Sequence, residues 1–358
     1  MTLIFLFLNA IIIVSCTEKD NQQIVDQEIV GTEKTSNSAM LTLGPGCTDP
    51  YLSGTFVDFW NKSTWSQTQW NDYMDEMLLV GVETVIVQFT AYNQYVWCNS
   101  SNSYSTEAYA NALPRLLTAA SNTGIEVYVG LYFNDEFWSN TTNTSILNTH
   151  ANRSKELATE IWNQYGSYSS FAGWYISHEP APYYYDTTLK FNIFKNNLVN
   201  AVSNHCDSIS NKPVAIAAFF NESLSSSNDL LYFMNRLGGC NLDVIMLQDG
   251  TGASENGTTP HCAIGNVATY FNDAKWGLYG ESPVFGGDFW SDTETFKPDG
   301  SPETFTKVEQ KLNIVDAYVT KIVTFQYFLD MGIDSPHTGS NQIAADSLRS
   351  QYRTYYAN

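Results

Sequence analysis

Two glutamates stand out because each follows a run of apolar and aromatic residues. Glu179 ends the stretch "FAGWYISHEP", and Glu294 lies in "FWSDTETF". A carboxylic acid at the edge of a buried core suits general acid–base or nucleophilic catalysis, and we expect the negative field of the other carboxylate to raise the pKa of Glu179 so that it stays protonated. The alternative for Glu179 is a rim carboxylate that forms a salt bridge with a neighbouring loop. Near Glu294, Asp288 or Asp292 could take the inward position instead.

Other polar and aromatic side chains end similar runs or lie just beyond them, and we expect them to bind the substrate. They are His178, Asp249, Gln248, Asp58, Gln88, Trp138, Tyr183, Trp290, Asp292 and Gln326. Sugar rings have apolar faces that stack on aromatic rings and hydroxyl rims that suit amides and carboxylates. This mixture therefore predicts a carbohydrate-binding cleft. Asp249 also has a purely conformational explanation, because Asp-Gly favours a turn.

Several kinds of site are not supported by the residue pattern. There is no Ser-His arrangement, no nucleophilic Cys and no glycine-rich phosphate loop, and the five histidines are scattered. We therefore expect neither a cofactor nor a metal ion. The formal net charge of −20 and the absence of a basic run argue against nucleic acid and anionic membrane surfaces as partners.

The elements that would position these side chains are short β-branched or aromatic runs that alternate with amphipathic segments, which is typical of βα units. The runs cover residues 54–60, 83–90, 125–133, 171–177, 213–220, 242–249, 283–290 and 321–328. Eight such runs, each followed by room for a helix, predict a single (β/α)8 TIM barrel over residues 46–358. The active site of such a barrel lies at the C-terminal ends of its strands, where the polar residues named above fall.

Cleavage of a glycosidic bond requires two carboxyl groups that flank it. Glu179 follows the fourth run and Glu294 the seventh, and this layout resembles the retaining glycosidases of clan A, which implies Glu179 as acid/base and Glu294 as nucleophile. Those enzymes carry Asn before the acid/base, where this chain has His178, and a histidine can still donate a hydrogen bond to a sugar hydroxyl. An inverting reaction with Asp249 as the base remains an alternative.

The segments "GTFVDFW", "GVETVIVQFT", "VYVGLYF", "FAGWYISHE", "LDVIMLQDGTG" and "FWSDTETF" resemble a bacterial family of barrel domains of unknown function. Members often occur on exported lipoproteins and are described as candidate glycoside hydrolases. The resemblance covers roughly residues 51–335 and implies the barrel together with glycosidase activity. The rival expectation is a surface lipoprotein that binds glycans on a degenerate barrel without turnover.

The N-terminal residues indicate export. Residues 1–16 form a short apolar stretch of the length of a signal peptide, and their end, "IVSC", resembles a lipobox that would lipidate Cys16. Residues 17–45 read as a polar tether, so we expect a monomeric protein anchored in the outer membrane or on the bacterial cell surface. An ordinary cleaved signal is the alternative. The other five cysteines would then form two disulfides and leave one free thiol.

Overall fold

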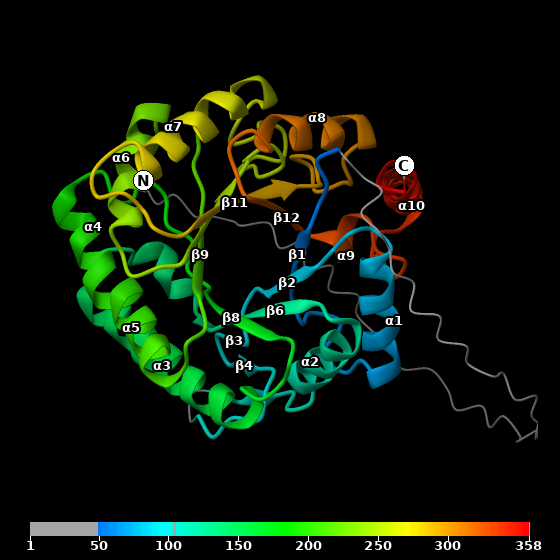
Figure 1. Ribbon diagram of the computed structural model, residues 1–358, viewed down its shortest axis with the longest axis horizontal. Helices are drawn as coiled ribbons and strands as arrows, with labels where there is room; N and C mark the ends of the chain where they lie inside the picture. The colour runs from blue at the N-terminus through cyan, green and yellow to red at the C-terminus, as the bar shows by residue number, and fades with distance from the viewer. Residues whose placement is uncertain (1–48, 103–104, 358) are drawn as a thin grey trace, which may run out of the picture.

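The computed structural model describes residues 49–102 and 105–357. Eight parallel strands close into a barrel in the order β1-β12-β11-β10-β9-β8-β6-β2, and helices surround them (Figure 1). The strands are β1 (Gly54–Val57), β2 (Thr84–Val87), β6 (Glu126–Gly130), β8 (Phe171–Ile176), β9 (Val214–Ala218), β10 (Val244–Gln248), β11 (Asp288–Glu294) and β12 (Lys321–Phe325). The predicted (β/α)8 barrel is confirmed. The predicted signal peptide (1–16), the tether (17–45), Cys16 and Cys47 lie outside the described residues.

The helices occupy the segments between the barrel strands and after the last of them. They are α1 (Gln67–Leu78), α2 (Ala112–Thr123), η1 (Asp135–Ser139), α3 (Thr144–Tyr165), α4 (Thr188–Phe194), η2 (Lys195–Val199), α5 (Asn200–Ile209), α6 (Ser227–Gly238), η3 (Ile264–Asn266), α7 (Val267–Tyr279), α8 (Phe305–Val315), α9 (Tyr327–Asp330) and α10 (Gly339–Tyr356). A small second sheet joins β5 (Glu107–Ala108), β4 (Tyr95–Val96), β3 (Ala91–Tyr92) and β7 (Tyr132–Phe133). Among the described residues, none of these helices is both long enough and apolar enough to cross a membrane.

The alternation of side chains along the strands divides the core in two. A small cluster fills the barrel interior and includes Phe56, Tyr175, Met246 and Trp290. A much larger cluster lies between the strands and the helices. Because alternate residues of a strand face opposite sides of the sheet, the interior cluster identifies which residues at the strand ends point inward.

The seventh barrel strand differs from its predicted position. The sequence pattern placed it at residues 283–290, whereas β11 spans Asp288–Glu294. Its second half is polar, and the outward-facing Ser291 and Thr293 hydroxyls hydrogen-bond to each other at 2.9 Å. An apolar-run criterion therefore ends the strand too early. The shift matters because it places Asp292 and Glu294 within the strand.

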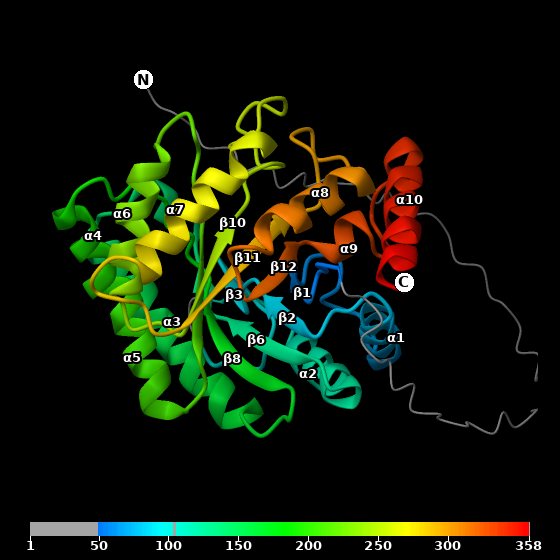
Figure 2. The same cartoon turned by 45° about the horizontal axis from the view of Figure 1, so that its top comes forward.

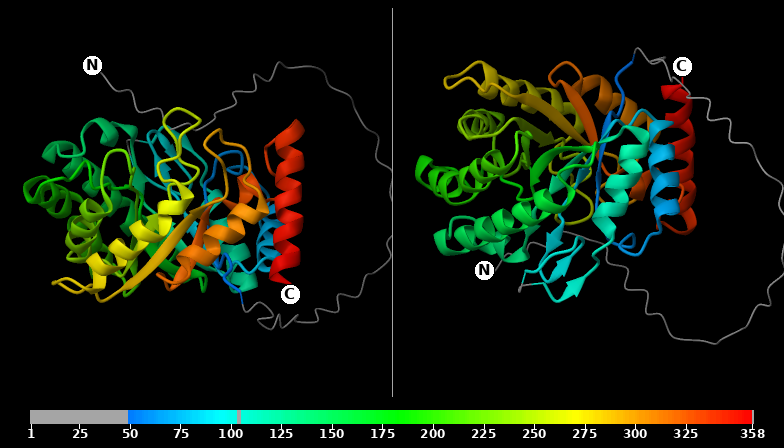
Figure 3. Two further views of the ribbon diagram at one scale, coloured as in Figure 1. Left: turned by 90° about the horizontal axis from the view of Figure 1, so that it is seen from above. Right: turned by 60° about the horizontal axis from the view of Figure 1, so that its bottom comes forward.

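The start of the barrel is tied to the C-terminal helix. The Tyr352 hydroxyl of α10 accepts a hydrogen bond from the Leu52 backbone N–H at 2.7 Å, and the Tyr355 hydroxyl donates to the Pro50 carbonyl at 2.7 Å. Gly81, which precedes β2 with a φ of 85°, packs against Tyr356 too closely to allow a side chain. Helix α10 also lies against α8 and α9 (Figures 2 and 3). The contacts of Tyr352, Tyr355 and Tyr356 lie at the end of the barrel where the strands begin.

The cysteines correct one expectation. Cys98, Cys206, Cys240 and Cys262 are all buried free thiols. Two disulfides among the five cysteines would require at least one bridge within this group of four, so the predicted pairing is wrong. Burial in an apolar core raises the pKa of each thiol and leaves it unreactive.

Candidate active site

Glu179 lies just beyond β8, at the C-terminal end of the barrel. It is in phase with Tyr175, which belongs to the interior cluster, so its side chain faces the barrel mouth. The residue is partly buried. Its carboxyl group lies close enough to the side chain of Gln248, the last residue of β10, for that amide to lower its pKa. The predicted strand-end glutamate is therefore held beside a predicted substrate-binding amide.

Glu294 is the last residue of β11 and is in phase with the inward-facing Trp290. Only 3% of its surface is exposed. The backbone N–H groups of Gly252 and Ala253 donate to its Oε2 at 2.5 and 2.9 Å. The Lys311 ammonium group donates to the Glu294 carbonyl oxygen. Two N–H donors and a nearby cation favour the charged form of this carboxyl.

Burial is the main cause of the shifted pKa of both glutamates. It raises the pKa of Glu179 to about 7, while the hydrogen bond from Gln248 acts in the opposite direction. It raises the pKa of Glu294 to about 8; the charge of Asp249 adds to this effect, and the N–H groups of Gly252 and Ala253 oppose it. For Glu179, desolvation therefore supplies the shift that the sequence argument had assigned to the field of the second carboxylate.

Asp249 faces away from the barrel mouth and organises the loop that holds Glu294. It is fully buried. Its Oδ1 accepts from the Thr251 N–H at 2.9 Å and from the Thr251 hydroxyl at 2.8 Å, and its Oδ2 accepts from the Glu294 N–H at 3.3 Å. With both oxygens engaged and no exposed surface, Asp249 cannot activate a water molecule. Asp249 is therefore excluded as the base of an inverting reaction. It is also excluded as a residue in direct contact with a sugar.

Asp292 and Trp290 occupy successive inward positions of β11. Asp292 is 2% exposed and lies opposite Gln248 in the β10–β11 pairing. Trp290 lies one layer deeper, where its ring contacts Tyr128 at a centroid distance of 5.5 Å and the Lys321 ammonium group lies 4.9 Å from its centroid. Trp290 is therefore a barrel-core residue, and the expectation that it contacts the substrate is corrected.

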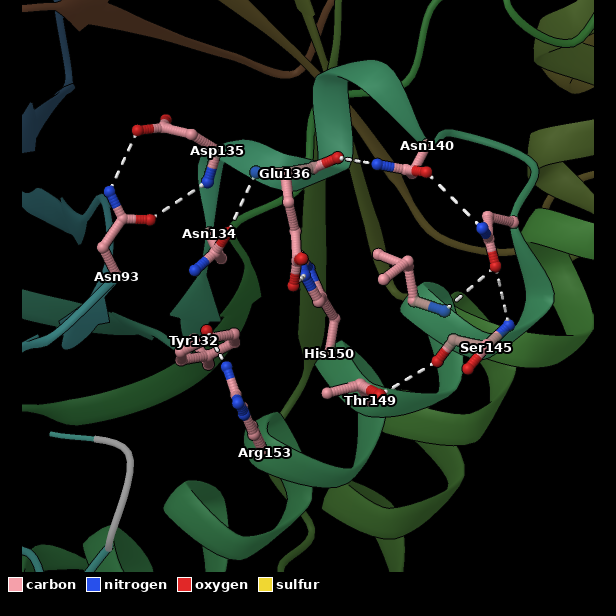
Figure 4. A network of polar contacts seen from close by, with 12 residues as sticks. Asn93, Tyr132, Asn134, Asp135, Glu136, Asn140, Ser145, Thr149, His150 and Arg153 are labelled. Carbon is pink, nitrogen blue, oxygen red and sulfur yellow. Dashed lines mark hydrogen bonds and ion pairs between the residues drawn. The ribbon is translucent and has the colours of Figure 1, made fainter.

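His178 belongs to a buried chain of hydrogen bonds behind Glu179. Its Nε2 lies 2.8 Å from His150 Nδ1, and His150 Nε2 lies 3.1 Å from Glu136 Oε1. Figure 4 shows Glu136 directly over His150, with Arg153 donating to Tyr132 nearby. Burial lowers the pKa of both imidazoles, so each is neutral. His178 has no exposed surface, which corrects the predicted contact with a sugar hydroxyl.

Aromatic side chains line one wall beside Glu179. Trp138 of η1 and Tyr183 are both partly buried, and both contact Phe219, which follows β9, with ring centroids at 6.1 and 5.9 Å. Tyr184 also contacts Phe219, at 6.3 Å. Glu179 contributes to the raised pKa of Tyr183, which places the two groups near each other. Trp138 and Tyr183 remain predicted sugar-binding residues.

Asp58 and Gln326 meet at the ends of β1 and β12. The Asp58 carboxylate accepts from Lys62 Nζ at 3.1 Å and from Gln326 Nε2 at 2.7 Å, and Gln326 is only 1% exposed. These contacts hold the two residues to each other, and the sugar contact predicted for them stays a prediction. Gln88, just beyond β2, is partly buried and in phase with the inward-facing Ile86, so its predicted role stands as a prediction.

Sequence reasoning missed the groups that hold Glu294. The donors on Gly252 and Ala253 are backbone groups, which leave no side-chain signal. Lys311 did leave a signal in the sequence. It lies among Val308, Leu312 and Val315 on the buried face of α8, and it is itself 1% exposed. A lysine on an apolar helix face requires a buried partner.

Within residues 49–102 and 105–357, no group of three or more His, Cys, Asp or Glu side chains is placed to hold a metal ion. The site therefore consists of the glutamates, the amides and aromatics around them, and the loop after β10. The model of a domain of unknown function, DUF4434, matches residues 52–340. The chain belongs to the DUF4434 family. This confirms the resemblance to a barrel family of unknown function.

Solved structures share the fold of this DUF4434 domain. A candidate α-L-fucosidase from Bacteroides thetaiotaomicron VPI-5482 matches with a TM-score of 0.70 and 22% identity, over 91% of this chain and 99% of that one. An endo-β-1,4-mannanase from Thermotoga petrophila matches with a TM-score of 0.60 and 11% identity, over 87% and 77% of the two chains. A family 1 β-glucosidase from Thermotoga maritima matches with a TM-score of 0.51 and 9% identity, over 86% of this chain and 97% of that one. At these identities the likeness shows the fold, and none of the curated proteins compared with the chain matches it.

Proposed function

We propose that the protein is a glycoside hydrolase that cleaves an oligo- or polysaccharide with retention of anomeric configuration. The observation that carries the proposal is the pair Glu179 and Glu294 on inward-facing positions at the same end of the barrel, in unlike surroundings. Glu179 is partly open and meets one side-chain amide, which suits a proton donor. Glu294 is held by two N–H groups, which oppose the rise of its pKa and suit a nucleophile fixed in one position.

The reaction follows a double displacement. The Glu294 carboxylate attacks the anomeric carbon while Glu179 gives its proton to the glycosidic oxygen, so the carbon–oxygen bond breaks and the leaving sugar departs as an alcohol. Glu179, now a carboxylate, takes a proton from water. The water oxygen then displaces Glu294 from the anomeric carbon, and both glutamates return to their starting states.

The surroundings favour turnover over binding alone. Ion pairs among the described residues involve other carboxylates, and neither Glu179 nor Glu294 is neutralised by one. Trp138 and Tyr183 supply rings on which a sugar could stack, and Gln248 supplies an amide. The likeness of the fold to barrels named as a mannanase and a β-glucosidase is consistent with this class.

The proposal also keeps the expectations about the N-terminal residues. The protein is exported and attached to the membrane through a lipid on Cys16, and it acts as a monomer on carbohydrate outside the cytoplasm. Metabolic labelling with a radioactive fatty acid tests the anchor. Label in the wild-type chain and none in Cys16→Ser supports it, whereas equal labelling of both refutes it.

A substrate screen tests the activity. The purified protein is incubated with a panel of polysaccharides and aryl glycosides, and new reducing ends are measured. On the best substrate, Glu179→Gln and Glu294→Gln should each lower kcat by at least about 10²-fold. Glu156→Gln, at an exposed position on α3, is the matched control. Full activity in both site variants would refute the assignment.

Two further measurements separate the alternatives. Nuclear magnetic resonance of the first sugar released should show the anomer of the substrate, and the opposite anomer would indicate inversion. Azide should restore turnover to Glu294→Ala and yield a glycosyl azide, because it replaces the missing nucleophile. If the protein binds a glycan tightly but no panel member is hydrolysed, the rival function of glycan binding is favoured.

A further inference from the structure

Asp292 is a third carboxyl group in the barrel mouth, in the same inward row of β11 as Trp290 and Glu294. It is 2% exposed, and its Cα partners are Gln248 of β10 and Val323 of β12. Its Oδ1 is buried and has no hydrogen-bond partner. A buried carboxyl oxygen without a partner is costly, so its retention points to a role in the site.

The charges that face Asp292 come from several elements. Burial places its pKa well above the usual range, and the carboxyl groups of Glu294, Glu179 and Asp249 raise it further, in that order. On β8, the phenol of Tyr175 is also buried without a partner, and it feels the charges of Glu179 and Asp292. Asp292 is thus the group that interacts with both proposed catalytic glutamates.

Lys311, the cation that acts on the Glu294 carboxyl group, is not among the groups that shift the pKa of Asp292. Lys311 directs its ammonium group to the Glu294 carbonyl oxygen and to the Thr251 hydroxyl, the latter at 2.9 Å. Several carboxylates in one largely buried site cannot all remain charged unless each is paired with a cation, because the desolvation cost of each anion is large. A carboxyl group that retains its proton is a hydrogen-bond donor, whereas its ionised neighbours only accept.

We propose that Asp292 is a positioning residue that stays a neutral carboxylic acid and presents its O–H to whichever catalytic glutamate is negatively charged. This inference rests on the proposed function. Before attack the anion is Glu294; in the covalent intermediate Glu294 is an ester and Glu179 is the anion. The proton of Asp292 remains on Asp292 throughout, and the bonds that form and break are those of the double displacement described above.

Kinetics of paired variants test the role. Asp292→Asn keeps the shape and a donor but cannot ionise, so kcat should stay within about tenfold of wild type. Asp292→Ala removes the donor and should lower kcat about 10²-fold with little change in KM. If Asp292 were instead the nucleophile, Asp292→Asn would be as inactive as Glu294→Gln. That result would overturn the proposal, as would an Ala variant as active as the Asn variant.

A spectroscopic measurement is independent of activity. At a pH above the pKa values of Glu179 and Glu294, the infrared spectrum of the wild-type protein should retain the carbonyl stretch of a protonated carboxyl group. The band should be weaker in Asp292→Asn than in the wild type and unchanged in Glu156→Gln, and a band of equal strength in all three proteins would refute the inference. Carbon-13 labelling of aspartate should shift the band in the wild-type protein, which needs no variant to fold. A spectrum without such a band refutes the inference.

The two proposals can fail separately. If Glu179→Gln and Glu294→Gln keep full activity, or no glycan is cleaved, the proposed hydrolase fails whatever the infrared result. If those variants are inactive and the band is absent, the hydrolase assignment stands and the inference about Asp292 fails.

Discussion

Glu179 is a partly buried carboxyl group whose ionisation should cost the folded protein stability. Its pKa rises from 4.5 to about 7 on folding, chiefly through burial. One pKa unit corresponds to about 1.36 kcal/mol, so replacing the ionisable group with neutral Gln should stabilise the protein by about 3 kcal/mol once the pH exceeds 7. Below 4.5 the glutamate is protonated in both the folded and the unfolded chain, and the two proteins should be equally stable. Between these values the wild type binds a proton that the unfolded chain lacks, so its stability falls as pH rises.

The assay is equilibrium unfolding in urea at pH 4.5 and at pH 8, followed by fluorescence of the tryptophans. The difference in free energy of unfolding between Glu179→Gln and wild type should be small at the lower pH and near its full value at the higher. Glu156→Gln, at an exposed site, should show no comparable gap. A gap that is the same at both pH values, or a destabilised Gln variant at pH 8, would refute the reasoning that burial raises this pKa. The variant should also be inactive, which would make Glu179 a position where function is kept at the expense of stability.

Other features of the site give further predictions. Because the pKa values of Glu179 and Glu294 are about 7 and about 8, kcat/KM should follow a bell that peaks between them, whichever group holds the shared proton; a maximum near pH 5 would contradict this. An added Cβ at Gly252 would lie 2.3 Å from the Phe296 carbonyl oxygen, so Gly252→Ala should displace the N–H donor to Glu294 and lower kcat about 10²-fold. Gly265→Ala, where a Cβ meets nothing within 4 Å, should be neutral, and equal losses in both variants would refute the argument. Because the four described cysteines are free, a reducing agent should leave the thermal midpoint unchanged, and a clear fall would reveal a disulfide.

The fold could be predicted from the sequence because each barrel strand is a short apolar run buried on both faces. Even the least regular runs, such as "PVAIAAFF", contain a strand, β9. The exception was β11, where polar residues continue the strand past its apolar part. Pairing with β10 and β12 satisfies the backbone of Asp292 and Glu294 there, and this tertiary contact is invisible to a pattern based on hydrophobicity.

The site was only partly predictable for a related reason. Glu179 and Glu294 could be found because a carboxyl group at the end of a buried run is unusual. His178 and Trp290 are residue types that bind sugars, and both lie near the predicted ends of barrel strands. Strand alternation, however, turns His178 outward to His150, and Trp290 is buried beneath the site. A shift of one residue along a strand turns a side chain from the face that meets the substrate to the face that packs in the core. Strand boundaries predicted from sequence are not accurate to a single residue.

The attachment of α10 to the start of the barrel fixes the end of the barrel at which the described chain begins. Pro50 and Leu52 are held by Tyr355 and Tyr352 at the end where the strands begin, whereas Glu179 lies where they finish. Residue 49, where the described chain begins, therefore lies at the opposite end of the barrel from Glu179. With the proposed lipid on Cys16, the chain that leads to the anchor would leave the barrel at the end opposite Glu179, so a long carbohydrate could reach the proposed site without passing that chain.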